Sequence, residues 1–400
     1  LPKDESPLVN SLLVPHIWGV GPLLILQYRN DLWGIAPLND HGEPRPQVLW
    51  RLPLIKIETG NQDTSRVEAN FRLRQPPPGF GVLENELTDS FQQRTGQVGI
   101  VTAGMLVYQT GGRLVAIDPA TGRTLWSRSQ LPTDSTVMGD GSHVVLVHQN
   151  NSRVTVLRAM DGRVRAKRDV PTSGQLLTWW GCRALLQEES EQGIIFKLWD
   201  AAKNRTLWKQ DAPAKTMAFG VDSERWGFLT SAGELTLLDT GNGQALAVTK
   251  LKSVTNPDQV YALADDQRIY LGISHKKLNS QAPAKSPILD DLPFRHPLFA
   301  GTLHAFNRRT GKAVWHTGWD HWALSLEQPA TGPVLVLFHR EKAGNDKKRS
   351  VLRCLEKRTG REIFSGRFPE TDEPPRWEEN ANQQEFEIQA FQTTLRLRYE

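Results

Sequence analysis

The chain has 400 residues, of which 38% are hydrophobic and 23% charged, and its formal net charge is +4. This is the composition of a soluble protein with enough apolar surface for a core, and the small charge disfavours a nucleic-acid binder. No run of 18 apolar residues is present, which argues against a membrane-spanning helix. The chain begins at Leu1 without a charged and apolar leader, which predicts a mature fragment or an excised domain.

One hairpin pattern recurs along the chain: a strand, a tight turn and a second strand that often ends in Trp. Its clearest copy is GGRLVAIDPATGRTLW. In chain order the copies occupy residues 31–50, 111–126, 152–166, 193–208, 233–248, 301–315 and 350–364. The middle turn positions Gly122, Gly162, Asn204 and Gly243 are 40, 42 and 39 residues apart. A period of roughly 40 to 45 residues is the size of one four-stranded propeller blade.

Three positions recur inside the hairpin, and each has a structural reason. Asp118 can accept hydrogen bonds from the backbone of its own turn. Gly122 suits a positive φ, which Asn204 also tolerates. Trp126 offers a large rigid surface to fill the wedge between neighbouring sheets. The predicted repeat positions are Asp118 and Asp239; Gly122, Asn204, Gly243, Gly311 and Gly360; and Trp50, Trp126, Trp208, Trp315 and Phe364.

The strands predict sheets that are covered on both faces. In RLVAID, Leu114 and Ala116 point to one face while Val115 and Ile117 point to the other, and both sets are apolar. Two more strands precede most hairpins. We therefore predict an all-β fold, a single β-propeller of four-stranded antiparallel blades, with seven blades or alternatively eight.

The period breaks in three places. Residues 52–95 contain no hairpin with a final Trp, which predicts an excursion from the ring or a degenerate eighth blade. Residues 275–300 predict a long Pro-rich loop between the second and third strands of one blade. Residues 340–350 are charged and predict a solvated tip, and the alternating tail 386–400 predicts two further strands.

The hairpin resembles the quinoprotein, or PQQ-like, propeller repeat, from about residue 10 to 368. The resemblance implies the fold, and it is closest to the non-enzymatic branch that includes the propeller lipoprotein of bacterial outer-membrane assembly. It also implies a periplasmic or otherwise extracytoplasmic location. Quinoprotein dehydrogenases carry a calcium-binding set of Glu, Asn and Asp and often a disulfide between adjacent cysteines. This chain has no adjacent cysteines and no carboxylate set that maps onto that pattern, so PQQ and calcium are not expected.

Few residues suggest a chemical site. Cys182 and Cys354 lack metal-site spacing and predict two separate buried or half-buried thiols. His316, Asp320 and His321 in HTGWDHW could bind a metal, or this stretch could be a polar loop whose tryptophans pack inward. In the long loop, Asp290, Asp291, Arg295 and His296 could form a polar patch or could be ordinary solvated charges. Arg163, Arg165 and Lys167 share one side of a strand, where they could bind an acidic partner or guard an exposed edge.

Three functions are compatible with these patterns. The first is a non-catalytic propeller, a monomeric domain that binds a protein partner or another domain of its parent chain. The second is an oxidoreductase of the quinoprotein class that depends on PQQ or a metal. The third is binding of carbohydrate or cell wall through exposed tryptophans. Nucleic acid is not expected as a partner, and no direct membrane span is expected.

Overall fold

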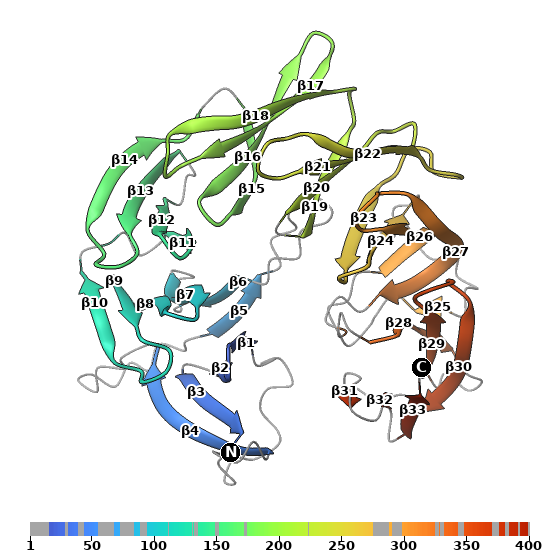
Figure 1. The fold of residues 1–400 in the computed structure, drawn as a ribbon, viewed down its shortest axis with the longest axis horizontal. Coiled ribbons are helices and arrows are strands. Elements are labelled where there is room, and N and C mark those ends of the chain that lie inside the picture. The colour runs from blue at the N-terminus through green and yellow to red at the C-terminus, as the bar shows by residue number, and fades with distance from the viewer. Residues whose placement is uncertain are drawn as a thin grey trace. The chain divides into compact units, whose positions relative to one another are not determined.

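Figure 1 shows the fold in a computed structural model of the chain. The structure describes residues 16–28, 31–38, 44–54, 68–72, 84–88, 94–110, 112–129, 131, 135–148, 152–171, 174–222, 224–274, 288–289, 298–324, 328, 332–342, 348–369, 376–380, 384–390 and 393–398. Within these ranges the regular secondary structure is β-strand, and no helix is found.

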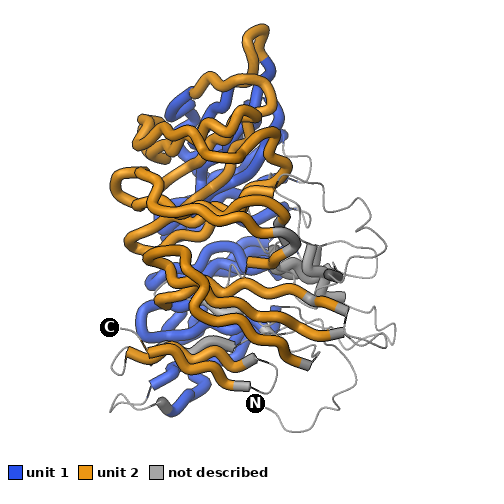
Figure 2. Tube along the Cα trace, turned by 90° about the vertical axis from the view of Figure 1, so that its right-hand side faces the viewer, with its two compact units in different colours: residues 1–76, 81–189, 195–209 blue, residues 77–80, 190–194, 210–400 orange. Residues whose placement is uncertain are grey.

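The chain divides into two compact units, which Figure 2 draws in different colours. Unit 1 comprises residues 1–76, 81–189 and 195–209. Unit 2 comprises residues 77–80, 190–194 and 210–400. Both units are built from antiparallel sheets whose strands follow one another along the chain.

The first two sheets extend from β1 to β10. The first has the order β1-β2-β3-β4, with β1 (His16–Val20), β2 (Leu23–Tyr28), β3 (Asp31–Leu38) and β4 (Pro44–Pro53). The second has the order β10-β9-β8-β7-β6-β5, with β5 (Glu68–Arg72), β6 (Glu84–Thr88), β7 (Arg94–Thr102), β8 (Met105–Thr110), β9 (Arg113–Ile117) and β10 (Thr124–Arg128).

Three regular four-stranded sheets follow, each with its strands in chain order. They are β11 (Thr136–Gly139), β12 (His143–Val147), β13 (Arg153–Arg158) and β14 (Val164–Asp169); β15 (Gln175–Trp180), β16 (Arg183–Ser190), β17 (Gly193–Asp200) and β18 (Arg205–Ala212); and β19 (Met217–Asp222), β20 (Arg225–Leu229), β21 (Glu234–Asp239) and β22 (Ala245–Lys250).

The remaining strands form an eight-stranded sheet and a three-stranded sheet. The larger contains β23 (Gln259–Ala264), β24 (Arg268–Ser274), β26 (Leu298–Asn307), β27 (Ala313–Leu324), β28 (Val334–Lys342), β29 (Lys348–Glu356) and β30 (Glu362–Pro369), with β25 (Ile288–Leu289) paired to β28. The smaller contains β31 (Arg376–Asn380), β32 (Glu385–Ala390) and β33 (Thr393–Arg398).

All seven hairpins of the repeat are antiparallel strand pairs. They are β3–β4, β9–β10, β13–β14, β17–β18, β21–β22, β26–β27 and β29–β30. Four-stranded antiparallel sheets in succession are the blades of a propeller. The predicted fold class, an all-β propeller, is confirmed.

The second sheet buries both faces at β9, because alternate side chains of this strand pack against different neighbours. Leu114 and Ala116 of β9 belong to a core cluster that includes Val144 and Leu157 of the third sheet. Val115 and Ile117 belong to another cluster, together with Ile25, Leu32 and Trp50 of the first sheet. The continuous apolar run RLVAI therefore serves two cores at once.

The segments outside the repeat also form strands. In the span 52–95, β5 and β6 form a hairpin that pairs with β7 and widens the second sheet, so this span adds strands to an existing blade. The predicted loop lies between β24 and β26, and its strand β25 pairs with β28. The tail contains β32 and β33, and β31 pairs with β32.

One sequence prediction of a loop is wrong. HTGWDHW is part of β27, which pairs with β26 and, at Ala323 and Leu324, with β28. Within it Trp319 pairs with Gly301 and Trp322 with Phe299, so the segment continues the strand. The predicted tip at 340–350 is described only at its two ends, where β28 and β29 pair out to Lys342 and Lys348. Residues 343–347 lie outside the described residues.

Candidate interaction site

Two turns lie together at the same end of each regular sheet. We call the turn between its first and second strands the inner turn, and the turn between its third and fourth strands the outer turn. In the third sheet the Ala159 amide donates to the Ser142 carbonyl at 2.9 Å. In unit 2 the Arg308 amide donates to the Gln267 carbonyl at 2.8 Å. The paired turns are therefore fixed to each other by backbone hydrogen bonds.

The outer turn is stabilised by its own acidic or amide side chain. Asp118 accepts hydrogen bonds from the Ala120 amide and the Thr121 hydroxyl, both at 2.9 Å. These bonds hold the pKa of Asp118 below its ordinary value. The turn closes at Gly122, where φ is +68°, and at the equivalent Asn204, where φ is +54°. Asp239 and Asn307 accept amide hydrogen bonds from their turns in the same way.

The indole of the outer strand binds the outer turn of the next sheet. Trp50 Nε1 donates to the Pro119 carbonyl at 2.8 Å, and Trp126 Nε1 donates to the Ala159 carbonyl at 2.7 Å. A Cβ atom added to Gly162 would lie 2.6 Å from the Trp126 ring, so this position excludes any side chain. In unit 2, Trp315 Nε1 donates to the Lys357 carbonyl at 2.9 Å.

The other aromatic positions of the repeat, Trp208 and Phe364, differ in burial. Trp208 is buried, whereas Phe364 is half-buried and lies 6.5 Å from Phe368, measured between ring centroids. The fifth sheet has Ala247 in place of an aromatic residue. A Cβ atom on Gly311 would lie 2.0 Å from the Ala247 Cβ, so the backbones approach more closely where the indole is missing.

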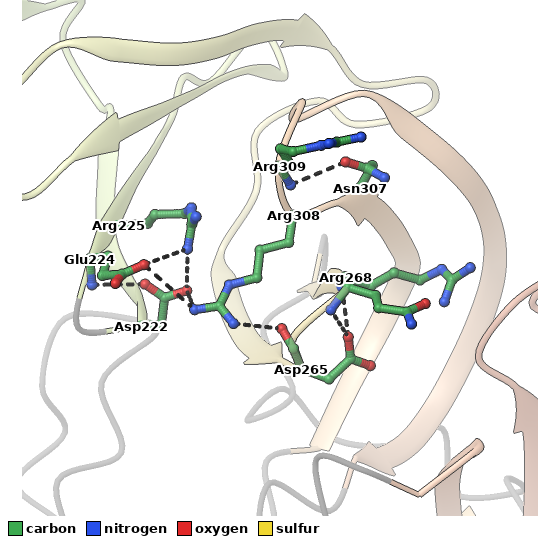
Figure 3. Close-up of polar contacts among 9 residues, drawn as sticks. Asp222, Glu224, Arg225, Asp265, Arg268, Asn307, Arg308 and Arg309 are labelled. Carbon is green, nitrogen blue, oxygen red and sulfur yellow. Dashed lines mark hydrogen bonds and ion pairs between the residues drawn. The ribbon is translucent and has the colours of Figure 1, made fainter.

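In unit 2 a row of ion pairs joins an inner turn to the outer turn of the next sheet. Asp222 lies at the end of β19, and its carboxylate is 2.9 Å from Arg225 and 3.1 Å from Arg308. Arg308 also lies 3.8 Å from Glu224, and it donates to the Asp265 carbonyl at 3.0 Å. Figure 3 shows the Arg308 side chain extended between the two inner turns.

A similar step recurs within the eight-stranded sheet, between the β23–β24 turn and the β29–β30 turn. Asp265 accepts hydrogen bonds from the Gln267 and Arg268 amides at 2.9 and 2.6 Å and from the Tyr270 hydroxyl at 2.9 Å. Lys357 Nζ, at the outer-turn position equivalent to Arg308, lies 3.7 Å from the Asp265 carboxylate. Asp265 and Lys357 are both buried, so this pair is shielded from water.

The paired turns leave a mixed set of charges at the surface. Glu224 and Asp266 are exposed on the inner turns, and Arg309 and Arg358 are exposed on the outer turns. The residues next to them are fixed by the ion pairs described above. The candidate interaction site consists of these four side chains and the turns that carry them.

A second charged cluster lies on β28. The Glu341 carboxylate accepts a hydrogen bond from Arg367 at 2.8 Å, forms an ion pair with Arg349 Nε at 2.6 Å, and lies 3.9 Å from His339. Burial lowers the pKa of His339 to about 4. The imidazole also packs edge-on against Trp322, with ring centroids 4.0 Å apart. His339 is therefore a neutral core residue near neutral pH.

Most of the site candidates from the sequence lie outside the described residues. His316 lies on β27 and stacks on His304, with ring centroids 5.6 Å apart. The side chains of Asp320 and His321, and the whole of Asp290, Asp291, Arg295 and His296, lie outside the described residues. Arg163, Arg165 and Lys167 are exposed beside or on β14, the outer strand of its sheet, and Arg163 lies 3.6 Å from Asp161.

Sequence reasoning did not identify the inner turns, although they carry a pattern. An aspartate is followed three residues later by His or Arg in Asp140–His143, Asp222–Arg225 and Asp265–Arg268. In each, the aspartate accepts amide hydrogen bonds within its turn. An aspartate three residues before His or Arg is a short and common pattern. It can be recognised as a repeat only when the strands of the sheets are aligned.

Comparison with known proteins adds a family match for part of the chain. Residues 83–178, just under a quarter of the chain, match the PQQ-repeat family model described as outer membrane protein assembly factor BamB. This chain carries PQQ-like propeller repeats. No curated protein matches it. Within the described residues, no helix has the length and apolarity needed to cross a membrane.

Solved structures with a similar fold include BamB and two dehydrogenases. BamB from Moraxella catarrhalis is 14% identical, with 95% of each chain covered and a TM-score of 0.42. The dihydro-heme d1 dehydrogenase NirN is 10% identical, covering 93% of this chain and 69% of that chain, with a TM-score of 0.45. A europium-containing methanol dehydrogenase is 8% identical, covering 93% and 81%, with a TM-score of 0.44. Similarities this low carry no argument about activity.

Proposed function

We propose that this chain is a non-catalytic propeller domain that binds a protein partner, or a neighbouring domain of its parent chain, outside the cytoplasm. The candidate interaction site of unit 2 is the contact surface. The observation that carries the proposal is the row of ion pairs from Asp222 through Arg308 to the Asp265–Lys357 pair. It fixes the turns, so the exposed charges beside them are held in place before a partner arrives, which lowers the entropic cost of binding.

The charges favour a folded protein surface as the partner. Acidic Glu224 and Asp266 lie on the inner turns and basic Arg309 and Arg358 lie on the outer turns, so both signs are exposed. A polyanion would be bound by a surface with basic residues alone, without exposed acidic residues among them. A protein surface can match a mixed pattern, and complementary charges select the partner and its orientation.

The buried carboxylates favour a structural role over a catalytic one. Among the described residues, Asp200 and Asp265 are the buried acidic residues. Asp200 accepts from the Lys203 amide at 2.9 Å and pairs with the Lys203 ammonium at 3.8 Å. Asp265 is held by its turn, Tyr270 and Lys357. Both carboxylates stabilise turns, and we propose that the domain acts without PQQ or calcium.

The test replaces Arg309 and Arg358, one at a time, with a photo-crosslinking amino acid in the organism that makes the protein. We expect a discrete crosslinked protein from both positions. The variant Arg309→Glu/Arg358→Glu should bind that protein at least ten-fold more weakly when both are purified. Arg205→Glu, at an exposed position of unit 1, is the matched control and should bind as the native protein does.

Two results would overturn the proposal. One is equal binding by the double variant and the control. The other is a bound chromophore after addition of PQQ and calcium, with dye reduction that depends on an alcohol substrate.

A further inference from the structure

The inner turn of the third sheet lies in unit 1 and has the same design as those of unit 2. Asp140 Oδ1 accepts from the Ser142 amide at 2.7 Å and from the His143 amide at 2.9 Å. Asp265 accepts hydrogen bonds from the Gln267 and Arg268 amides in the same way. One Asp140 oxygen is thus used by the turn, and the carboxylate also interacts with the Cys182 thiol.

The third sheet differs in the residue of the following sheet that faces the Asp140 carboxylate. In unit 2 the β26–β27 turn supplies Arg308 to Asp222, and the β29–β30 turn supplies Lys357 to Asp265. In unit 1 the equivalent outer-turn residue is Ala201, whose amide donates to the Cys182 carbonyl as the Arg308 amide donates to that of Gln267. Alanine has no charge to offer. The cation that pairs with the inner-turn aspartate in unit 2 therefore has no side-chain equivalent at this position.

Three metal-ligating side chains lie at this place instead. Asp140, His143 and Cys182 each offer one ligand atom, and these atoms all lie within 4.8 Å of one another. They come from the inner turns of two successive sheets, since Cys182 lies between β15 and β16. The Cys182 thiol also lies 3.8 Å from the His143 carbonyl.

We propose that Asp140, His143 and Cys182 bind a zinc ion, which supplies the positive charge that Arg308 and Lys357 supply in unit 2. Sulfur, imidazole nitrogen and carboxylate oxygen are the usual protein ligands of zinc. Tetrahedral zinc with bonds of about 2.0 to 2.3 Å places its ligand atoms about 3.3 to 3.8 Å apart. Small rotamer changes of the Asp140 and His143 side chains, which are 54% and 37% exposed, would bring the ligand atoms into that range.

The carboxylates near the Cys182 thiol attract a cation, whereas burial of the thiol disfavours its ionised form. Burial raises the pKa of Cys182 well above its ordinary range, and the nearby carboxylates of Asp140 and Asp200 raise it further. The same negative charges attract a divalent ion. On binding, the thiol proton is released to solvent and the zinc–sulfur bond forms.

The site is open on one side. The side chains of Asp140 and His143 are 54% and 37% exposed, while Cys182 is buried. An ion can therefore enter from solvent and keep a water molecule as its fourth ligand. Three protein ligands and an open position also occur in zinc sites that bind exchangeable ligands.

The test uses the purified protein after chelator treatment, titrated with Co²⁺ as a spectroscopic probe and with Zn²⁺ by calorimetry. We expect one ion per chain, a thiolate-to-cobalt absorption band and proton release on binding. Cys182→Ser should abolish the band. His143→Gln and Asp140→Asn should each weaken Zn²⁺ binding roughly ten-fold or more. Asp140→Asn retains the oxygen that accepts the turn amides, so it keeps the fold while removing the ligand charge.

Cys354→Ser is the matched control. Cys354 is also buried, but it packs in an apolar cluster with Val336, Leu352 and Phe386. This variant should bind Zn²⁺ and Co²⁺ as the native protein does. The proposal is wrong if no thiolate band appears, or if Cys182→Ser, His143→Gln and Asp140→Asn bind Zn²⁺ as tightly as Cys354→Ser.

Discussion

The Asp140 turn of unit 1 and the Asp222 and Asp265 turns of unit 2 share one backbone design and differ in what faces the carboxylate. In unit 2 the next outer turn supplies Arg308 or Lys357. In unit 1 it supplies Ala201, and Cys182 and His143 lie beside Asp140. The repeat thus determines where each turn lies, while the residue at one variable outer-turn position determines which group faces the aspartate.

The largest expected effect separates the two kinds of turn. Asp265→Ala should lower the free energy of unfolding by about 3 to 5 kcal/mol, because it leaves Lys357 and Tyr270 buried without their acceptor. Asp140→Ala should cost only about 1 kcal/mol, because water can replace the lost bonds at this exposed turn. Urea unfolding monitored by tryptophan fluorescence measures both. Equal losses would show that burial of the pair does not distinguish the turns.

The second prediction concerns a contact that both units share. Trp126→Ala in unit 1 and Trp315→Ala in unit 2 should each lower the free energy of unfolding by about 3 kcal/mol, since each removes a packed indole and its hydrogen bond. Trp315→Phe retains most of the packing and should cost about 1 kcal/mol. A loss confined to one unit would mean that the indoles do not have a common structural role.

The third prediction concerns the buried histidine of unit 2. Because the pKa of His339 is about 4 in the folded protein and about 6.5 in an unfolded chain, the unfolded chain binds the proton first as the pH falls. Stability is then complete above pH 6.5 and is lost progressively down to about pH 4, by on the order of 2 to 3 kcal/mol. His339→Gln should remove most of this slope in urea unfolding. If the pH dependence of stability were unchanged in His339→Gln, other titrating groups would be its cause.

Much of the fold could be predicted from the sequence, because its determinants are local. Apolar residues on both faces of RLVAI, glycine or asparagine at positive φ and a terminal Trp identify each hairpin without knowledge of its neighbours. Local reasoning failed for HTGWDHW, where the charged and imidazole groups predicted a loop. This segment is part of strand β27.

The candidate sites could not be predicted, because they depend on which turns meet in space. Arg308 and Asp222 belong to different repeats, and no local pattern indicates that they lie 3.1 Å apart. Cys182 was predicted to be a separate buried thiol. It is buried, but its neighbours Asp140 and His143 come from the preceding sheet.

In unit 2 the Arg308 cation of an outer turn stabilises the Asp222 carboxylate at the inner turn of the preceding sheet. A double-mutant cycle of Asp222→Asn and Arg308→Met, followed by urea unfolding, measures this stabilisation. We expect a coupling free energy of about 1 to 2 kcal/mol, because the pair is only partly exposed. Additivity of the two single losses within about 0.3 kcal/mol would contradict it.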